Sequence, residues 1–142
     1  MKKFKHILIA AIVALTVFPA MQSCKKGEDD PGLSLRSRKQ RITNDWTLTK
    51  VEKNGENQDV KGQTYKLNFH KSGSLTQTVQ GTFFGATTTK TSEGTWEFVN
   101  DKEDVKINID NETTIFQIQR LAHDELILKE NDGGNTYTYY FE

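Results

Sequence analysis

The stretch YKLNFHKSGSLT, residues 65–76, predicts a β-hairpin. Its apolar residues Tyr65, Leu67 and Phe69 alternate with polar ones, so they share one face of an extended chain. Lys-Ser-Gly at residues 71–73 then supplies a turn, and a second run rich in threonine follows. The alternation therefore predicts two antiparallel strands with one buried face.

The same pattern repeats along most of the chain. Runs rich in Thr, Val, Ile, Phe and Tyr are separated by turns rich in Asn, Asp and Gly. No long helical pattern interrupts the series, so neighbouring strands are expected to pair antiparallel. The expected strands are residues 46–53, 64–70, 74–83, 87–99, 105–110, 113–121, 125–129 and 135–141.

These strands predict an all-β fold, an antiparallel up-and-down barrel of eight strands with a short N-terminal helical turn before residue 44. Closure into a barrel is favoured because it removes exposed strand edges. A β-sandwich is the alternative. An eight-stranded barrel has an interior that side chains fill or that holds one small ligand.

The N-terminus has the order of a secretory signal peptide. A basic start precedes an apolar run at residues 7–18, and small residues follow it. The run is 12 residues long, whereas a membrane-spanning helix needs about 20. Residues 1–23 are therefore expected to be a signal peptide that is removed.

Cys24 is the only cysteine of the chain, so it has no partner for an internal disulfide. The junction of Ser23 with Cys24 resembles the lipobox of bacterial lipoproteins, in which the cysteine is lipidated. That resemblance implies an anchor of several acyl chains at Cys24, which is enough for stable attachment to a membrane.

Residues 24–33 are expected to form a flexible tether, because charge runs are usually solvated. Its start, CKKGEDD, resembles the acidic export signal of surface-displayed Bacteroidetes lipoproteins. The resemblance implies a lipid-anchored protein of the outer membrane, displayed on the cell surface. The periplasmic face of the outer membrane is the alternative.

Composition and motifs exclude several classes of function. Residues 1–23 hold three of the 19 basic residues and none of the 19 acidic ones, which leaves 16 basic against 19 acidic residues, a net charge of −3. A nucleic-acid partner is therefore not expected.

The sequence also carries no catalytic or metal-binding motif. His70 and His123 fall at turns, and the chain lacks a nucleophile elbow, zinc-ligand spacings and an EF-hand loop. No enzyme activity, catalytic residue, metal or cofactor is expected.

Four stretches of the expected barrel, the opening hairpin among them, resemble a known family of domains. They are SLRSRKQRITNDWTLTKV at residues 34–51, YKLNFHKSGSLT at 65–76, GTWEF at 94–98 and FQIQRLAHDELILK at 116–129. They resemble the lipocalin-like domain of small Bacteroidetes lipoproteins. The resemblance implies a barrel domain over residues 34–142 that binds a small hydrophobic or amphipathic molecule in or at the mouth of the barrel.

Aromatic residues are the candidates for contacting such a ligand, although a plain core accounts for them better. They are Trp46, Tyr65, Phe69, Phe83, Phe84, Trp96, Tyr137 and Tyr139.

Two functions follow from this sequence. One is a ligand-binding barrel, favoured by a cavity lined by polar residues such as Thr76, Gln77, Gln117 or Gln119. The other is a filled barrel that serves as a protein-interaction module of an envelope or nutrient-uptake complex. An exposed loop at residues 83–84 would favour the second.

Overall fold

The computed structural model describes residues 30–32, 34–60 and 62–142, apart from the side chain of Phe83. The expected signal peptide, Cys24 and most of the expected tether lie outside the described residues. Within the described part, no helix is long and apolar enough to cross a membrane. Every helix and strand of the described residues begins after residue 37, so a chain that starts at residue 24 or 30 contains all of the elements described below.

The described residues form a short helix, a 3-10 turn at Asn100–Lys102 and nine strands. The elements are α1 (Arg38–Ile42), β1 (Asp45–Lys53), β2 (Glu56–Gln58), β3 (Gln63–Phe69), β4 (Ser74–Phe83), β5 (Ala86–Val99), β6 (Asp104–Ile109), β7 (Glu112–Leu121), β8 (Leu126–Asp132) and β9 (Asn135–Phe141).

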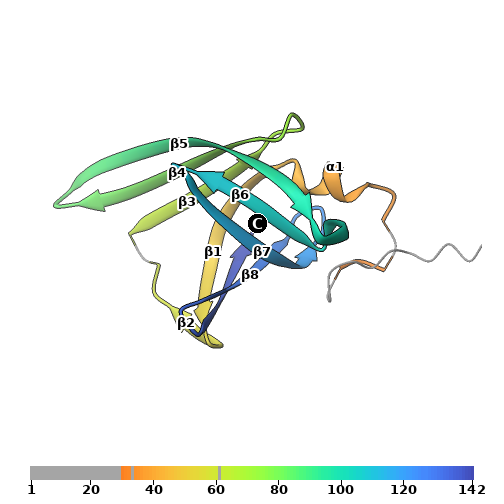
Figure 1. Cartoon of the computed structure of the whole chain (residues 1–142). Coiled ribbons are helices and arrows are strands. Elements are labelled where there is room, and N and C mark those ends of the chain that lie inside the picture. Colours follow the sequence, from red (N-terminus) through yellow and green to blue (C-terminus); the bar gives the residue numbers. More distant parts are fainter. Residues whose placement is uncertain (1–29, 33, 61) are drawn as a thin grey trace, which may run out of the picture.

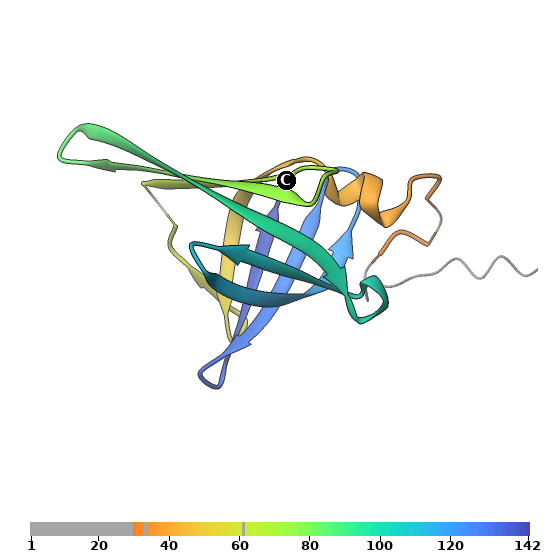
Figure 2. The same ribbon diagram turned by 45° about the horizontal axis from the view of Figure 1, so that its top comes forward.

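Antiparallel pairing closes the sheet into a barrel. From β3 to β9 each strand pairs with the next in the chain, and β3 pairs with β1. The last strand returns to the first, with Phe141 opposite Leu48 and Tyr137 opposite Lys53. Eight of the described strands, all except β2, thus form an up-and-down barrel, and the fold that the sequence predicts is confirmed (Figures 1 and 2).

Strand β2 was not expected, since the sequence predicted only a turn after Lys53. The chain reverses at Asn54 and Gly55, whose φ angles are 53° and 85°, and β2 then pairs with the end of β1. Its three residues are all polar and exposed, so they lack the apolar alternation that marks a strand.

The two ends of the barrel differ. Strand β3 pairs with β1 only near the beginning of β1, at Asp45–Asn68 and Thr47–Lys66. The far half of β1 pairs with β2 instead. The wall therefore splits between β1 and β3 at the end away from α1, and Figure 1 shows β2 leading into this gap. We call this end the mouth and the end with α1 the closed end.

The closed end holds the tightest part of the core. Fully buried apolar side chains gather there from the helix and from strand residues near it. They are Ile42, Trp46, Phe69, Leu75, Val105, Ile118, Leu121 and Leu126. Both tryptophan indole N–H groups are satisfied, with Trp46 Nε1 donating to the Ile42 carbonyl and Trp96 Nε1 to the His70 carbonyl, each at 2.9 Å.

Helix α1 starts at Arg38 because Ser37 and Gln40 form a capping box. Ser37 Oγ accepts from the Gln40 backbone N–H, and Gln40 Oε1 accepts from that of Ser37. Arg38, Arg41 and Ile42, spaced three and four residues apart, form its buried face. The helix therefore covers the closed end.

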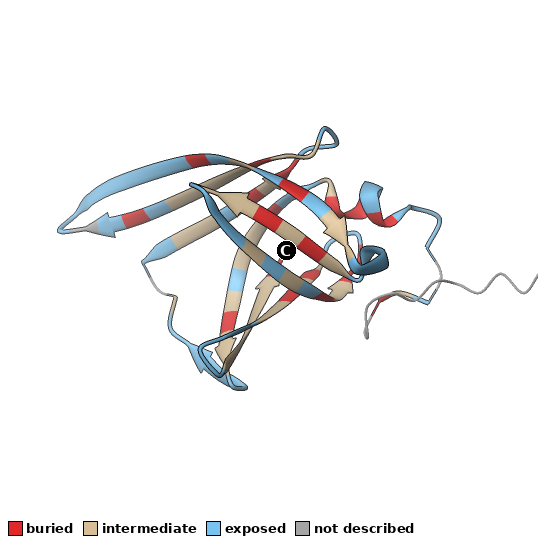
Figure 3. Cartoon of the chain, in the orientation of Figure 1, coloured by how far each residue is buried: buried red, intermediate tan, exposed pale blue. Residues whose placement is uncertain are grey.

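The hairpin of β4 and β5 extends beyond the rest of the barrel, and its far end is exposed (Figures 1 and 3). Its turn consists of Phe84 and Gly85, with φ angles of 47° and 80°. A positive φ is unusual for a bulky residue, yet the Phe84 side chain is fully exposed. The hairpin tip thus presents an aromatic ring to solvent.

Candidate ligand-binding cavity

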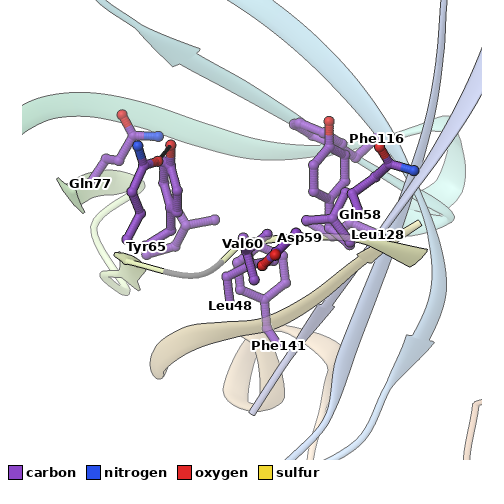
Figure 4. Close-up of a pocket in the computed structure, with 13 residues that line it drawn as sticks. Leu48, Gln58, Asp59, Val60, Tyr65, Gln77, Phe116, Leu128 and Phe141 are labelled. Atoms are coloured by element: carbon purple, nitrogen blue, oxygen red, sulfur yellow. Dashed lines mark hydrogen bonds between the residues drawn. The ribbon is translucent and has the colours of Figure 1, made fainter. Parts of the chain in front are cut away.

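A cavity of about 540 Å³ lies inside the barrel at the mouth. The inward faces of several strands and the segment after β2 enclose it (Figure 4). Its lining consists of Leu48, Val51, Gln58, Asp59, Val60, Gln63, Tyr65, Leu67, Gln77, Phe116, Leu128, Tyr139 and Phe141. Figure 4 shows Tyr65 and Gln77 on one side of the cavity and Phe116 and Leu128 on the other.

Strand alternation explains why most of this lining is apolar. Residues two apart on one strand face the same side, so Tyr65 and Leu67 of β3 both reach the cavity, as do Tyr139 and Phe141 of β9. Most polar side chains of the lining belong to Gln58, Asp59 and Gln63, which lie at the split in the wall between β1 and β3. The result is an apolar chamber with a few amide, phenol and carboxylate groups.

Aromatic rings build one wall of the cavity. Phe116 of β7 meets Tyr139 of β9 edge to face, with ring centroids 5.9 Å apart. Tyr137 stacks on Tyr139, with centroids 6.5 Å apart, and Lys53 Nζ lies 5.6 Å from the centroid of the Tyr137 ring. These contacts hold the Tyr139 ring in place against the cavity.

The Tyr139 hydroxyl donates to Glu130 Oε1 at 2.6 Å. Burial raises the pKa of this phenol well above its usual value, and the hydrogen bond to Glu130 raises it further. The hydroxyl therefore stays protonated at physiological pH. Because its proton points to Glu130, the oxygen offers a ligand its lone pairs and acts as an acceptor.

A smaller cavity of about 230 Å³ adjoins the first. The two share Leu67, Gln77 and Phe116 in their linings. Its other walls come from β6 and β7 and include Ile107 and Thr114. Gln77 on β4 thus stands at the junction of the two cavities.

The aromatic candidates from the sequence divide into three groups. Tyr65 and Tyr139 line the main cavity. Trp46, Phe69 and Trp96 are buried in the hydrophobic core instead.

The remaining candidates are not among the residues that line the main cavity. Tyr137 stacks on the Tyr139 ring, and Phe84 occupies the exposed hairpin tip. Phe83 ends β4, and its side chain lies outside the description.

Of the polar candidates, only Gln77 lines either cavity. Thr76 faces outward and donates to Glu93, and Gln117 is exposed. Sequence reasoning missed Leu48, Val60, Phe116 and Leu128 as lining residues. Alternation marks such residues as inward-facing, but it does not say which end of the barrel stays unfilled.

Neither histidine of the folded part approaches the cavity. His70 Nε2 lies 3.4 Å from Thr76 Oγ1, and His123 Nδ1 lies 2.8 Å from Arg36 Nη1. Both residues are exposed and follow strands that end near α1. Among the described residues, no group of His, Cys, Asp or Glu could hold a metal ion.

Strand order and cavity together define the class of protein: an antiparallel up-and-down β-barrel with one packed end and one open end. No protein-family model matches the sequence, and no curated protein matches it significantly. A crystal structure of a lipocalin-like protein from Bacteroides uniformis ATCC 8492 is similar, with 17% identity over 70% of this chain and 96% of the other, and a TM-score of 0.49. A deswapped triple mutant of bovine odorant binding protein is similar over 71% of this chain and 72% of the other, with 12% identity and a TM-score of 0.43.

Proposed function

We propose that this protein binds one small hydrophobic or amphipathic molecule in the cavity at the mouth of the barrel. The cavity itself carries the proposal. Its volume of about 540 Å³ falls within the range of about 300–1,000 Å³ that is typical of small-molecule sites. Protein interiors are normally close-packed, so a bound apolar molecule would supply contacts that the side chains lining this chamber lack.

Binding is passive in this proposal. Apolar surface of the ligand leaves water, which contributes about 25 cal/mol per Å² buried. Polar groups of the ligand meet Gln77, the Tyr139 oxygen, and the pair in which Tyr65 donates to Gln63 Oε1 at 2.5 Å. These groups orient the ligand, and no catalytic step is involved.

A second candidate function is that of a protein-interaction module in an envelope or nutrient-uptake complex. The exposed Phe84 at the tip of the β4–β5 hairpin favours it, because an aromatic ring presented at a strained backbone position suits a contact with another protein. The two functions are compatible, since the hairpin tip and the cavity use different residues.

Native mass spectrometry tests the binding proposal. We expect residues 30–142, produced in a Bacteroidetes host and purified gently, to carry a reproducible mass excess that disappears when the protein is denatured. The mass of the excess would give the size of the ligand. A mass equal to that of the polypeptide alone would contradict a stably held ligand.

Attachment to the outer membrane through lipid on Cys24, with display on the cell surface, is part of the proposal. Replacing Cys24 by alanine should move the protein from the membrane fraction to the soluble fraction, because no thiol remains to be acylated. Immunoblots of the two fractions measure this, with Lys26→Ala as the control that should stay with the membrane. A Cys24→Ala variant that stays membrane-bound at wild-type levels would refute the anchor.

A further inference from the structure

Asp30 belongs to the segment expected to be a solvated tether, yet its side chain is buried. Only 4% of the residue is exposed. Its carboxylate pairs with Arg38 of α1 and lies 3.9 Å from Arg41 Nη2. The other carboxylate oxygen accepts the backbone N–H of Leu121, at the end of β7, at 2.7 Å. Asp30 thus joins the N-terminal segment to both the helix and the barrel wall.

The Asp30 carboxylate also compensates the positive charges of two buried arginines, Arg38 and Arg41. Arg38 and Arg41 are 6% and 7% exposed, and burial lowers the pKa of Arg38, which shows how poorly the site solvates its charge. Arg38 Nε and Nη2 and Arg41 Nε are buried without a hydrogen-bond partner among the described residues. Both described salt bridges of these arginines end on Asp30. Its carboxylate is therefore the main compensation for two buried cations.

The position of Asp30 limits where Cys24 can lie. Five residues lie between the two, and the six residue steps of a fully extended chain span at most about 22 Å. The closed end, where Asp30 binds, is opposite the mouth. Strand β1, whose nine residues run from the closed end to the mouth, spans roughly 30 Å at about 3.3 Å per residue, and the 14 residues of β5 span roughly 45 Å. Cys24 therefore cannot reach the mouth or the hairpin tip while Asp30 is bound.

We propose that Asp30 is a latch that fastens the N-terminal segment to the closed end of the barrel, so that the anchor and the mouth lie at opposite ends. The closed end then faces the bilayer, and the cavity exchanges its ligand with the aqueous side. Phe84 also points away from the membrane that holds the anchor, so its partner is not that membrane. That the closed end faces the bilayer rests on the proposed lipidation of Cys24. That Cys24 lies near the closed end follows from the contacts of Asp30 and does not depend on lipidation.

The single cysteine allows a direct test without lipid. A nitroxide spin label on Cys24 of residues 24–142 broadens the NMR signals of nearby amides. We expect strong broadening in α1, at residues 100–103 and at residues 122–125, all at the closed end. Signals of residues 84–85 and 133–134, at the turns on the mouth side, should keep their intensity. Equal broadening at both ends, or stronger broadening at the mouth, would overturn the latch.

Asp30→Asn tests the role of the carboxylate. The variant keeps the shape of the side chain but removes its charge, so the closed-end broadening should weaken and spread over more of the barrel. Asp124→Asn, an exposed aspartate in the turn between β7 and β8, is the matched control and should leave the pattern unchanged. Unlabelled spectra confirm that each variant is folded. A folded Asp30→Asn variant with the wild-type pattern would show that the carboxylate does not hold the segment.

Discussion

Replacing Gly94 by alanine is expected to destabilise the barrel by about 3 kcal/mol or more, the upper end of the usual cost of overpacking. A Cβ atom at this position would lie 2.2 Å from the Asn108 carbonyl oxygen and 2.8 Å from Ile109 Cγ1. The first of these is a backbone atom of β6, so the clash is relieved only if strands β5 and β6 separate. Glycine in a strand commonly marks such a close approach of two backbones.

Urea unfolding followed by the fluorescence of the two buried tryptophans measures this effect. In thermal unfolding followed by the same fluorescence, the melting temperature should fall by roughly 10 °C or more, given the usual relation for domains of this size. Gly32→Ala is the matched control, since a Cβ there meets nothing within 4 Å and its stability should not change. Equal stability of the two variants would mean that the register of β5 against β6 is wrong, because Gly94 pairs with Ile109 in that register.

The second large effect concerns ligand binding. Gln77 is half-buried and stands where the two cavities meet, so a tryptophan there fills the space that a ligand would occupy. The substitution removes no core residue, and aromatic residues are well suited to strands. We expect Gln77→Trp to weaken the binding of an apolar ligand at least tenfold, which corresponds to about 1.4 kcal/mol, while the barrel stays folded.

Local pattern was sufficient to predict the barrel. Alternating residues such as Tyr65, Leu67 and Phe69 mark an inward face, and Asn, Asp and Gly mark the turns. These signals depend only on neighbouring residues. The strand order was predictable because short turns between successive strands leave little choice other than antiparallel neighbours. The structure confirms this order.

The cavity depends on contacts that no local pattern encodes. Trp46, Phe69 and Trp96 were candidates for the ligand site, but each stands near the end of the barrel that α1 covers, and so each is packed into the core. The mouth stays open because β2 takes the place of β3 beside the end of β1. Since β2 is polar and exposed, the sequence carried no signal of this exchange.

Asp30 is a second instance of a tertiary contact that overrides the local pattern. A run of acidic residues usually indicates a solvated segment. Its burial depends on two arginines that are spaced three residues apart on α1, and on the backbone N–H of Leu121 at the end of β7, which donates to the Asp30 carboxylate. Only the fold brings these groups to one place.

The claim that the cavity is a binding site is tested most directly by titrating the barrel with N-phenyl-1-naphthylamine, a neutral dye that fluoresces strongly in apolar surroundings. Wild type, Gln77→Trp and Gln80→Trp are compared, the last being an exposed glutamine on the outer face of the same strand. We predict saturable binding to wild type and to Gln80→Trp, and binding at least tenfold weaker to Gln77→Trp. Equal binding by all three proteins, or no saturable binding by wild type, would contradict a ligand site inside the mouth of the barrel.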